Sequence, residues 1–456
     1  MNKRFFSLLA LIVMICMAVT LFAGCGGSGN ATSGKNEQSP QAASTQESQA
    51  GSTASAAGQN TSAGSEKGSV SALIWIPDAP ETMQQIMDEF MKANPNIKVD
   101  LQLMTGSSVE ENIQPKAAAN NLPDLMSVNA NAFAAALADE GKIIDVSDME
   151  AWKNTIDSLQ AEWTSPKGIH FGISGGLATT LIYYNKDQFE KAGIKELPKD
   201  FNEFLAVCES LKKAGFTPIM WNGGFPNMLG NGPFSYGFAN NVVRVNPDWK
   251  KQMANGTLNL NTKEVADIFA KIKLFADKGY VQKGYMSTDY NQGMQLFVEG
   301  KTAMAFHGTW VSSTFMNCKG FKTGVFLPPW NEKGEKLVPV VGSETGWAIA
   351  EGPNKALAVK VLEYMNGDGF HFYQNKRQCV PPFKQTKGEV KLAPEIIDLV
   401  KQLNEYPTAG GLYFAVLPSN CVDLSHKLMQ EVLLGQKTPQ QAAEALDKAA
   451  KEGVKK

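Results

Sequence analysis

Val70-Ser-Ala-Leu-Ile-Trp-Ile76 is an apolar stretch that ends at Pro77, and together with the two segments after it this stretch predicts the fold class. The next residues, about 80–93, place apolar side chains at the i, i+3, i+4, i+7 spacing of one helix face, at Met83, Ile86, Met87 and Phe90. After Asn94-Pro95, residues 97–103 (Ile-Lys-Val-Asp-Leu-Gln-Leu) alternate apolar and polar as a half-buried strand does. This alternation of strand and helix predicts an α/β fold with a largely parallel, doubly wound sheet.

The carboxyl ends of such strands are where ligands of doubly wound sheets bind. A further short strand, Leu125 to Val128, is followed by an Ala-rich helix from about Asn131 to Ala138. The loops after Ile76 and after Val128 are therefore the first candidates for a binding site.

The rest of the chain adds a second set of elements and ends in a helix with Thr438 as N-cap and Pro439 in its first position. A strand is expected near 181–184, and helices over 200–213 and 263–278. The stretch from Val70 to Lys456 is too long for one hydrophobic core, so we expect two lobes.

Charge and cysteine usage exclude several classes of protein. The formal net charge of −2 gives no basic face for nucleic acid or an anionic membrane. Beyond the first 25 residues the cysteines are widely spaced without a C-x-x-C pair, so no metal site is expected and we interpret them as mostly buried thiols: Cys208, Cys318, Cys379 and Cys421.

No catalytic motif is present in the sequence. It contains no nucleophile elbow, phosphate-binding loop or triad pattern, and the four histidines lack the spacing of a metal-binding helix: His170, His307, His371 and His426. Only His307, beside Gly308, is in a position to reach the candidate site. We predict no catalytic residues and no cofactor.

The N-terminus has the order of charges and apolar residues of an export signal. Lys3 and Arg4 precede an apolar run from Phe5 to Phe22 and the small residues at 23–24. A membrane-spanning anchor is the alternative for this run. The sequence Leu21-Phe22-Ala23-Gly24-Cys25 resembles a bacterial lipobox, although Phe22 stands where Leu is preferred. The resemblance implies a signal peptide over 1–24 and a lipidated Cys25 that anchors the protein on the extracytoplasmic face of the cell membrane.

Residues 25–69 are predicted to be a disordered tether. From 26 to 69 the chain has no Leu, Ile, Val, Met, Phe, Tyr or Trp, and Ser, Ala, Gly, Gln and Thr dominate. Such a composition cannot offset the entropy of ordering. A chain of roughly 44 such residues has an r.m.s. span of about 35–40 Å.

Several motifs in the remaining sequence resemble family 1 of the extracellular solute-binding proteins, the maltose-binding-protein-like group. The clearest stretch is Gly172 to Pro218, with Tyr184-Asn-Lys-Asp-Gln-Phe-Glu-Lys-Ala-Gly-Ile194 inside it. The others are Leu122-Pro-Asp124, Gly141-Lys-Ile-Ile-Asp145, Phe297-Val-Glu-Gly-Lys-Thr-Ala-Met304, Gly308-Thr-Trp310, Gly342 to Ala350, and Leu434-Gly-Gln-Lys-Thr-Pro439. Each motif is weak alone, and their order over almost all of 70–456 carries the resemblance.

The resemblance implies a type II, two-lobed periplasmic-binding-protein-like fold with a three-segment hinge. The crossings are expected near 175–180, 336–340 and 379–385. Lobe 1 would then hold 70–178 and 339–380, and lobe 2 would hold 179–338 and 381–456. It also implies a monomer that closes on a carbohydrate ligand and delivers it to the permease subunits of an ABC transporter. The membrane is contacted through the lipid anchor only, and nucleic acid is not a partner.

A carbohydrate site needs flat aromatic surfaces and groups that hydrogen-bond hydroxyls. For lobe 2 the resemblance places Trp310 against the sugar face, with core packing as the alternative. Core packing is also the alternative for the other lobe 2 candidates, which are Trp221, Asn222, Tyr413 and Phe414.

In lobe 1 the candidates follow the predicted strands and a later turn. They are Trp75, Asp78, Glu81, Asn129, Asn131 and Glu344. Trp75 has a core position as its alternative, Glu81 a helix N-terminus and Asn131 a helix cap. Asp124 is interpreted as structural, and Trp347 as part of a strand.

Two other functions remain open on sequence grounds. The ligand of a binding protein with these lobes could instead be a peptide, a polyamine or a metal chelate. A glycoside hydrolase also combines carboxylates and aromatics in a cleft. The aromatic loops and the absence of a cationic cluster favour a neutral sugar.

Overall fold

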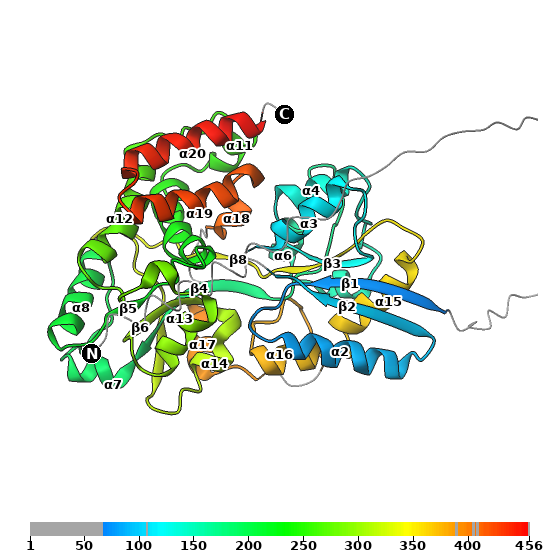
Figure 1. Cartoon of the computed structure of the whole chain (residues 1–456), viewed down its shortest axis with the longest axis horizontal. Coiled ribbons are helices and arrows are strands. Elements are labelled where there is room, and N and C mark those ends of the chain that lie inside the picture. The colour runs from blue at the N-terminus through cyan, green and yellow to red at the C-terminus, as the bar shows by residue number, and fades with distance from the viewer. Residues whose placement is uncertain (1–66, 106–107, 388–390, 404–405, 407–409, 455–456) are drawn as a thin grey trace, which may run out of the picture. The chain divides into compact units, whose positions relative to one another are not determined.

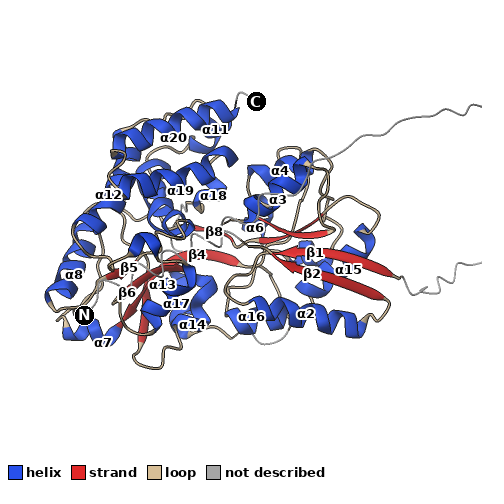
Figure 2. Ribbon diagram, in the orientation of Figure 1, coloured by secondary structure: helices blue, strands red, loops and turns tan. Residues whose placement is uncertain are grey.

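The computed structural model describes residues 67–456, apart from 106–107, 388–390, 404–405, 407–409 and 455–456. The predicted signal peptide, Cys25 and nearly all of the predicted tether lie outside the described residues. The described part of the chain falls within one compact unit that contains two β-sheets flanked by helices (Figures 1 and 2).

The first sheet has the strand order β2-β1-β3-β9. Its strands are β1 (Gly68–Ile74), β2 (Ile97–Leu103), β3 (Leu125–Val128) and β9 (Gly346–Ile349). β1 runs parallel to both β2 and β3, and only the β3–β9 pair is antiparallel. The prediction of a largely parallel sheet is thus confirmed here. β1 ends two residues earlier than expected, so Trp75 and Ile76 belong to the following loop.

Helices cover both sides of this sheet, α2 and α16 on one side and α3 and α4 on the other (Figure 1). The helices of this region are α2 (Pro80–Ala93), α3 (Val109–Ala118), α4 (Ala132–Asp139), α5 (Glu150–Asn154), α6 (Asp157–Glu162), α15 (Lys355–Asn366) and α16 (Phe370–Arg377). The apolar face predicted for α2 is buried at Met83, Ile86, Met87 and Phe90. Asp124 is structural as expected, because its carboxylate accepts hydrogen bonds from Ser71 and Asn354.

The second sheet has the order β5-β6-β4-β7, and β8 pairs with β4 beyond this path. Its strands are β4 (Leu177–Asn185), β5 (Ile219–Met220), β6 (Met304–Gly308), β7 (Thr323–Phe326) and β8 (Val341–Ser343). β4 is antiparallel to β6, β7 and β8, whereas β5 and β6 are parallel. The sheet is mixed because β6 and β7 run toward the end at which β4 begins.

The helices around the second sheet include two π-helical turns, η1 and η2. They are α7 (Lys186–Lys191), α8 (Phe201–Lys213), α9 (Asn227–Leu229), η1 (Gly230–Phe234), α10 (Ser235–Phe238), η2 (Ala239–Val243), α11 (Trp249–Ala254), α12 (Lys263–Asp277), η3 (Tyr285–Ser287), α13 (Tyr290–Val298), η4 (Thr309–Val311), α14 (Ser312–Phe315), α17 (Pro394–Leu403), α18 (Tyr413–Val416), α19 (Ser419–Leu433) and α20 (Pro439–Val454). Thr438 caps α20 as predicted, since its hydroxyl accepts from the backbone N–H of Gln441.

Three segments far apart in the sequence meet between the two sheets. Residues 177–179 pair with 341–343 in antiparallel register, and Leu177 also pairs with Val380. These segments fall at or beside the three crossings expected from the sequence. The lobe boundaries themselves stay a prediction.

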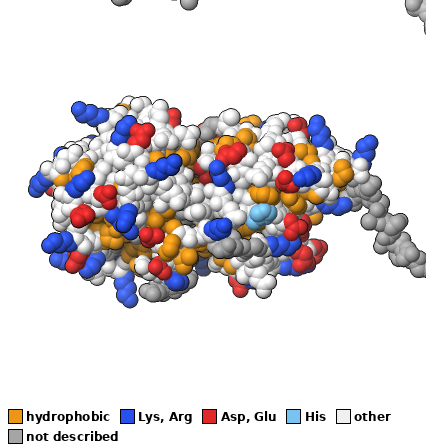
Figure 3. Space-filling view, turned by 90° about the horizontal axis from the view of Figure 1, so that it is seen from below, with side chains coloured by type: hydrophobic (Ala, Val, Ile, Leu, Met, Phe, Trp, Pro, Cys, Tyr) orange, Lys and Arg blue, Asp and Glu red, His pale blue; other side chains and the backbone are white. Residues whose placement is uncertain are grey.

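The surface shows no region of one charge on the face drawn in Figure 3, where acidic and basic side chains are interspersed. Over the described residues, no helix is both long and apolar enough to cross a membrane. All four cysteines of the described part are free thiols, and three of them are buried.

Candidate functional site

A pocket lies between loops and helices that belong to the two sheets. It holds about 710 Å³ of empty space, part of which is open to solvent. Its lining residues are Trp75, Ile76, Pro77, Asp78, Ser108, Val109, Asn129, Phe225, Asn227, Met228, Asn231, Tyr290, Trp310, Ser343, Glu344, Thr345, Tyr373, Arg377, Leu412 and Phe414.

The strand directions explain why these residues meet. Trp75 to Asp78 follow the carboxyl end of β1, and Asn129 follows that of β3. On the other side, Trp310 follows β6, and the segment from Phe225 to Asn231 comes after β5. Since β5 and β6 are parallel, their carboxyl ends share one edge. The carboxyl ends of β1 and β3 in the first sheet and of β5 and β6 in the second therefore lie at the pocket, in line with the rule for open α/β sheets.

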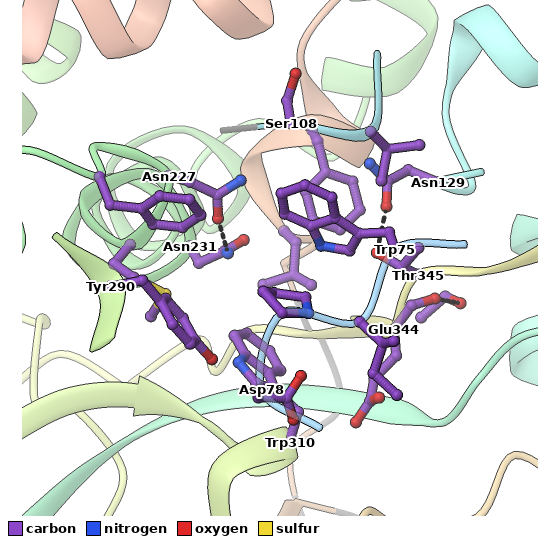
Figure 4. A pocket seen from close by; sticks show the side chains of 18 of the residues that line it. Trp75, Asp78, Ser108, Asn129, Asn227, Asn231, Tyr290, Trp310, Glu344 and Thr345 are labelled. Carbon is purple, nitrogen blue, oxygen red and sulfur yellow. Dashed lines mark hydrogen bonds between the residues drawn. The ribbon is translucent and has the colours of Figure 1, made fainter. Parts of the chain in front are cut away.

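Aromatic rings form much of the wall (Figure 4). They come from separate regions of the chain: Trp75, Phe225, Tyr290, Trp310 and Phe414. The indole of Trp310 lies directly over Gly308, where a Cβ atom would stand 2.1–2.3 Å from three of its ring carbons. A glycine at 308 is therefore what allows Trp310 to occupy this place.

A buried ion-pair cluster forms another part of the pocket wall. Nε of Arg377 donates to Oδ2 of Asp78 at 2.8 Å, and its Nη1 donates to Oε2 of Glu344 at 2.5 Å. Nη1 also donates to the hydroxyl of Tyr373, which itself donates to Glu344. The three charged side chains are at most 8% exposed.

Burial raises the pKa of Glu344, and the Arg377 guanidinium opposes that rise. Burial alone would lower the pKa of Arg377, but Asp78 and Glu344 hold it well above its usual value. Arg377 therefore stays charged and fixes both carboxylates in place. The backbone N–H of Glu344 donates to Gly176, so this cluster also reaches the crossing segments.

Asn129 is held by a second buried carboxylate, Glu110. Oε1 of Glu110 accepts from the amides of Asn129 at 3.0 Å and Asn131 at 2.6 Å. The amide oxygen of Asn129 accepts from the hydroxyl of Thr345 at 2.8 Å (Figure 4). Burial raises the pKa of Glu110, while Asn129 and Asn131 lower it. The amide of Asn129 is thus oriented before any ligand arrives.

Three residues on the wall carry buried polar atoms without a hydrogen-bond partner. They are Oδ1 of Asn231, the hydroxyl of Tyr290 and Oε1 of Glu344. A buried polar atom without a partner costs about 1–3 kcal/mol, so such atoms call for an explanation. Oε1 of Glu344 is turned toward Gly176, whereas Asn231 and Tyr290 lie across the pocket from Glu344 (Figure 4).

Six of the eleven ligand-binding residues expected from the sequence line this pocket: Trp75, Asp78, Asn129, Trp310, Glu344 and Phe414. The other five lie elsewhere. Trp221 is buried in the core against Phe275, and the amide of Asn222 donates to the backbone carbonyl of Asp289. Tyr413 is buried behind the wall with its hydroxyl bonded to two side chains.

Glu81 and Asn131 have the local roles that were their alternatives. Glu81 is exposed in the first turn of α2, and its ion pair with Lys376 at 2.9 Å lowers its pKa. Asn131 is the N-cap of α4, where its side chain accepts from the backbone N–H of Ala134. Trp347 lies in β9 as expected.

Sequence reasoning missed the pocket residues that stand on helices and their flanking loops. Asn227 and Asn231 lie on consecutive turns of α9 and η1, Tyr290 begins α13, and Arg377 ends α16. The capping box formed by Asp289 and Gln292 is a sequence signal for the start of α13. It does not reveal that the first residue of that helix faces a pocket.

His307 does not line the pocket, although it was the histidine expected near it. Its ring contacts Tyr290, Trp310 and Phe315 from behind the wall. Burial lowers the pKa of His307 to about 3, so the imidazole is neutral. Among the described residues, no group of His, Cys, Asp and Glu side chains has the arrangement of a metal site.

Comparison with known proteins gives the family. The sequence over residues 76–370 matches bacterial extracellular solute-binding proteins. The chain is 23% identical to the maltodextrin-binding protein MdxE of Bacillus subtilis (strain 168), over 74% of this chain and 79% of that protein. It is 21% identical to the multiple sugar-binding protein of Streptococcus mutans serotype c, over 62% and 67% of the two chains.

A solved structure shares the fold. The structure of a chitin oligosaccharide binding protein superposes with a TM-score of 0.74 at 22% identity, and the match covers 86% of this chain and all of the other. The chain belongs to the family of bacterial extracellular solute-binding proteins.

Proposed function

We propose that this protein is the extracytoplasmic carbohydrate-binding component of an ABC importer. The observation that carries the proposal is the pairing of aromatic rings with unpartnered polar atoms on one pocket wall, from Trp310 and Phe225 to Asn231 and Tyr290. A sugar presents an apolar C–H face beside a belt of hydroxyls, and this wall offers a partner for each.

The named relatives support the same ligand class. The proteins described as multiple sugar-binding and maltodextrin-binding are similar over 62% and 74% of this chain. The chitin oligosaccharide binding protein has the same fold. A further solved structure of the same fold, a sugar transporter from Bacillus licheniformis, is in complex with stachyose.

In this proposal Trp310, Phe414 and Trp75 provide the apolar contacts. Asp78 accepts from sugar hydroxyls because only its Oδ2 is used by Arg377. Asn129 contributes a pre-oriented amide. For the predicted residues outside the pocket, such as Trp221, the buried packing supports a structural role.

The wider setting belongs to the same proposal. A signal peptide of 24 residues would direct export, and lipidation of Cys25 and the tether would then hold the protein at the outer face of the membrane. The lobes, divided as predicted, would close on the sugar, and the closed monomer would dock on the permease subunits. The sugar would leave unchanged, because Asp78 and Glu344 are both bound to Arg377 rather than poised as an acid and a nucleophile.

Calorimetric titration and thermal unfolding with maltotriose, raffinose and chitotriose test the ligand class. At about 100 times its dissociation constant, a bound sugar is expected to stabilise the fold by roughly 2.7 kcal/mol. Spermidine and a tripeptide are the matched non-sugar ligands. Binding of either of these without binding of any sugar would overturn the proposal, and release of hydrolysed sugar would place the protein among enzymes.

A further inference from the structure

A chain of hydrogen bonds connects the pocket wall to a histidine behind it. Nδ2 of Asn231 donates to Oδ1 of Asn227 at 2.6 Å, and Nδ2 of Asn227 donates to the hydroxyl of Tyr413 at 3.0 Å. The same hydroxyl lies 2.8 Å from Nε2 of His426. Asn227 and Asn231 stand side by side at the pocket, joined by the first of these bonds (Figure 4).

The donors and acceptors give a direction to each bond in this relay, which consists of Asn231, Asn227, Tyr413 and His426. An amide nitrogen only donates, so the Tyr413 oxygen accepts from Asn227, and Nε2 of His426 is the acceptor within reach of its own hydrogen. The neutral imidazole must then carry its proton on Nδ1. That nitrogen lies 3.8 Å from the carboxylate of Asp423. All hydrogens thus point the same way, an arrangement in which each bond polarises the next.

The imidazole stays neutral at neutral pH. Burial lowers the pKa of His426 to about 4, against the opposing effect of Glu111 from α3. Asp423 on its own helix and the hydroxyl of Tyr413 on α18 are the other titratable groups that face it. Burial also raises the pKa of Tyr413 well above its usual value, so its hydroxyl keeps its hydrogen.

The backbone holds Tyr413 rigidly against the helix that bears the two asparagines. Its N–H donates to the hydroxyl of Ser235 at 2.8 Å, and that hydroxyl donates to the carbonyl of Gly230. A Cβ atom on Gly230 would stand 3.0 Å from the ring of Tyr413. The ring of Tyr413 therefore depends on Gly230 for its close approach to the helix, and the hydroxyl of Tyr413 has a fixed position within hydrogen-bond distance of Asn227.

The free end of the relay is Oδ1 of Asn231. Nδ2 of Asn231 donates to Asn227, so the amide oxygen of Asn231 is the atom of this side chain that is still available to a ligand. This oxygen is buried without a hydrogen-bond partner. We propose that Asn231 is a specificity-determining ligand residue that accepts a hydrogen bond from one sugar hydroxyl. Asn227, Tyr413 and His426 are positioning residues that keep its oxygen, and not its nitrogen, facing the ligand. This rests on the proposed function, since it deepens the description of the same site.

The relay is testable without a ligand. In protein labelled with ¹⁵N-histidine, the ring nitrogen shifts at pH 7 report which nitrogen of each imidazole carries the proton. His426 is expected to show the proton on Nδ1, and the His426→Gln variant assigns its signals. A proton on Nε2 would reverse the relay and overturn the inference.

The role of Asn231 is tested with the sugar that binds most tightly among maltotriose, raffinose and chitotriose, and with its monodeoxy and deoxyfluoro derivatives. Fluorine can accept but not donate. At one hydroxyl position of the sugar, the deoxy and the deoxyfluoro derivative are both expected to bind about tenfold more weakly than the parent sugar. This corresponds to a loss of about 1.4 kcal/mol of binding free energy. In Asn231→Ala this discrimination between the parent sugar and its derivatives should disappear. In Tyr413→Phe the discrimination should weaken while the protein stays folded.

Two variants separate positioning from general damage. His426→Gln offers an oxygen that accepts from Tyr413 and should retain discrimination, unlike His426→Leu. Tyr280→Phe is the matched control, because its hydroxyl bonds to Glu209 away from the pocket. If Asn231→Ala still distinguishes the parent sugar from its derivatives as the wild-type protein does, this inference is overturned and the proposed function stands. A wild-type protein that binds none of the three sugars would overturn the proposed function and this inference together.

Discussion

The Trp310 platform can be removed without touching Trp310 itself. Gly308 has φ −88° and ψ 168°, which any residue adopts, so backbone freedom does not require a glycine there. The indole of Trp310 does require a glycine at 308, because a Cβ atom there would stand 2.1 Å from the nearest ring carbon. Ordinary contact between carbons needs about 3.5 Å. Gly308→Ala must therefore push the indole by about 1 Å or more from its place in the pocket.

The expected loss of binding follows from the role of the ring. A central aromatic side chain in a binding site contributes about 2 kcal/mol or more, so Trp310→Ala should weaken sugar binding roughly thirtyfold. Gly308→Ala keeps the ring but displaces it, and we expect a loss between about tenfold and thirtyfold. Since Trp310 is only half-buried, its truncation should cost less than the about 3–5 kcal/mol typical of a buried Trp.

Calorimetric titration gives the affinities, and urea unfolding of the same variants gives their stability. Gly352→Ala is the matched control, because a Cβ atom there meets nothing within 4 Å. Normal binding by Gly308→Ala would refute the inference that the ring position matters. A Trp310→Ala protein that loses mainly stability while its folded fraction binds normally would refute the platform role.

Three further predictions concern charge and anchoring. Arg377→Met leaves two buried carboxylates unpaired and should lower the free energy of unfolding by about 3–5 kcal/mol, with partial recovery in the double variant with Glu344→Gln, measured by urea unfolding. Burial lowers the pKa of His307 to about 3 in the folded protein. As the pH falls, the imidazole of His307 is therefore protonated in the unfolded chain before it is protonated in the folded protein. Stability should therefore be independent of His307 above about pH 6.5 and decrease by about 1.4 kcal/mol per pH unit between about pH 6.5 and about pH 3, a slope that the difference from His307→Gln should isolate. Cys25→Ala should release the protein from the membrane fraction into the medium, and retention of the processed variant would contradict lipid anchoring.

The fold was predictable because its signals are local. The alternation of strand and helix over residues 70–128 gives the parallel order of β1, β2 and β3, and the apolar spacing in α2 gives its buried face. The mixed second sheet was not predictable in this way. β4 ends at Asn185, whereas its partners β6 and β7 begin at Met304 and Thr323, and no periodicity in a strand reports the direction of a distant neighbour.

The site was predictable where a residue follows a strand directly. Trp75, Asp78, Asn129 and Trp310 all come within four residues of a strand end, and the strand direction alone places them at the pocket. Tyr290 and Arg377 stand instead at helix ends. Their positions depend on how α13 and α16 pack against the rest of the protein, which the local sequence does not encode.

Two adjacent residues show most clearly how far the site can be predicted from the sequence. Tyr413 and Phe414 are neighbours in α18, and a helix turns by about 100° per residue, so the two rings must point in different directions. Phe414 lines the pocket, whereas Tyr413 is buried behind it. Sequence alone gave both rings the same role, since both are aromatic and close to the glycines at 410–411. The hydroxyl distinguishes them, because a buried Tyr needs a partner for it, and Tyr413 finds two in Asn227 and His426. Its burial behind the wall is thus what allows Tyr413 to orient an amide that faces the pocket.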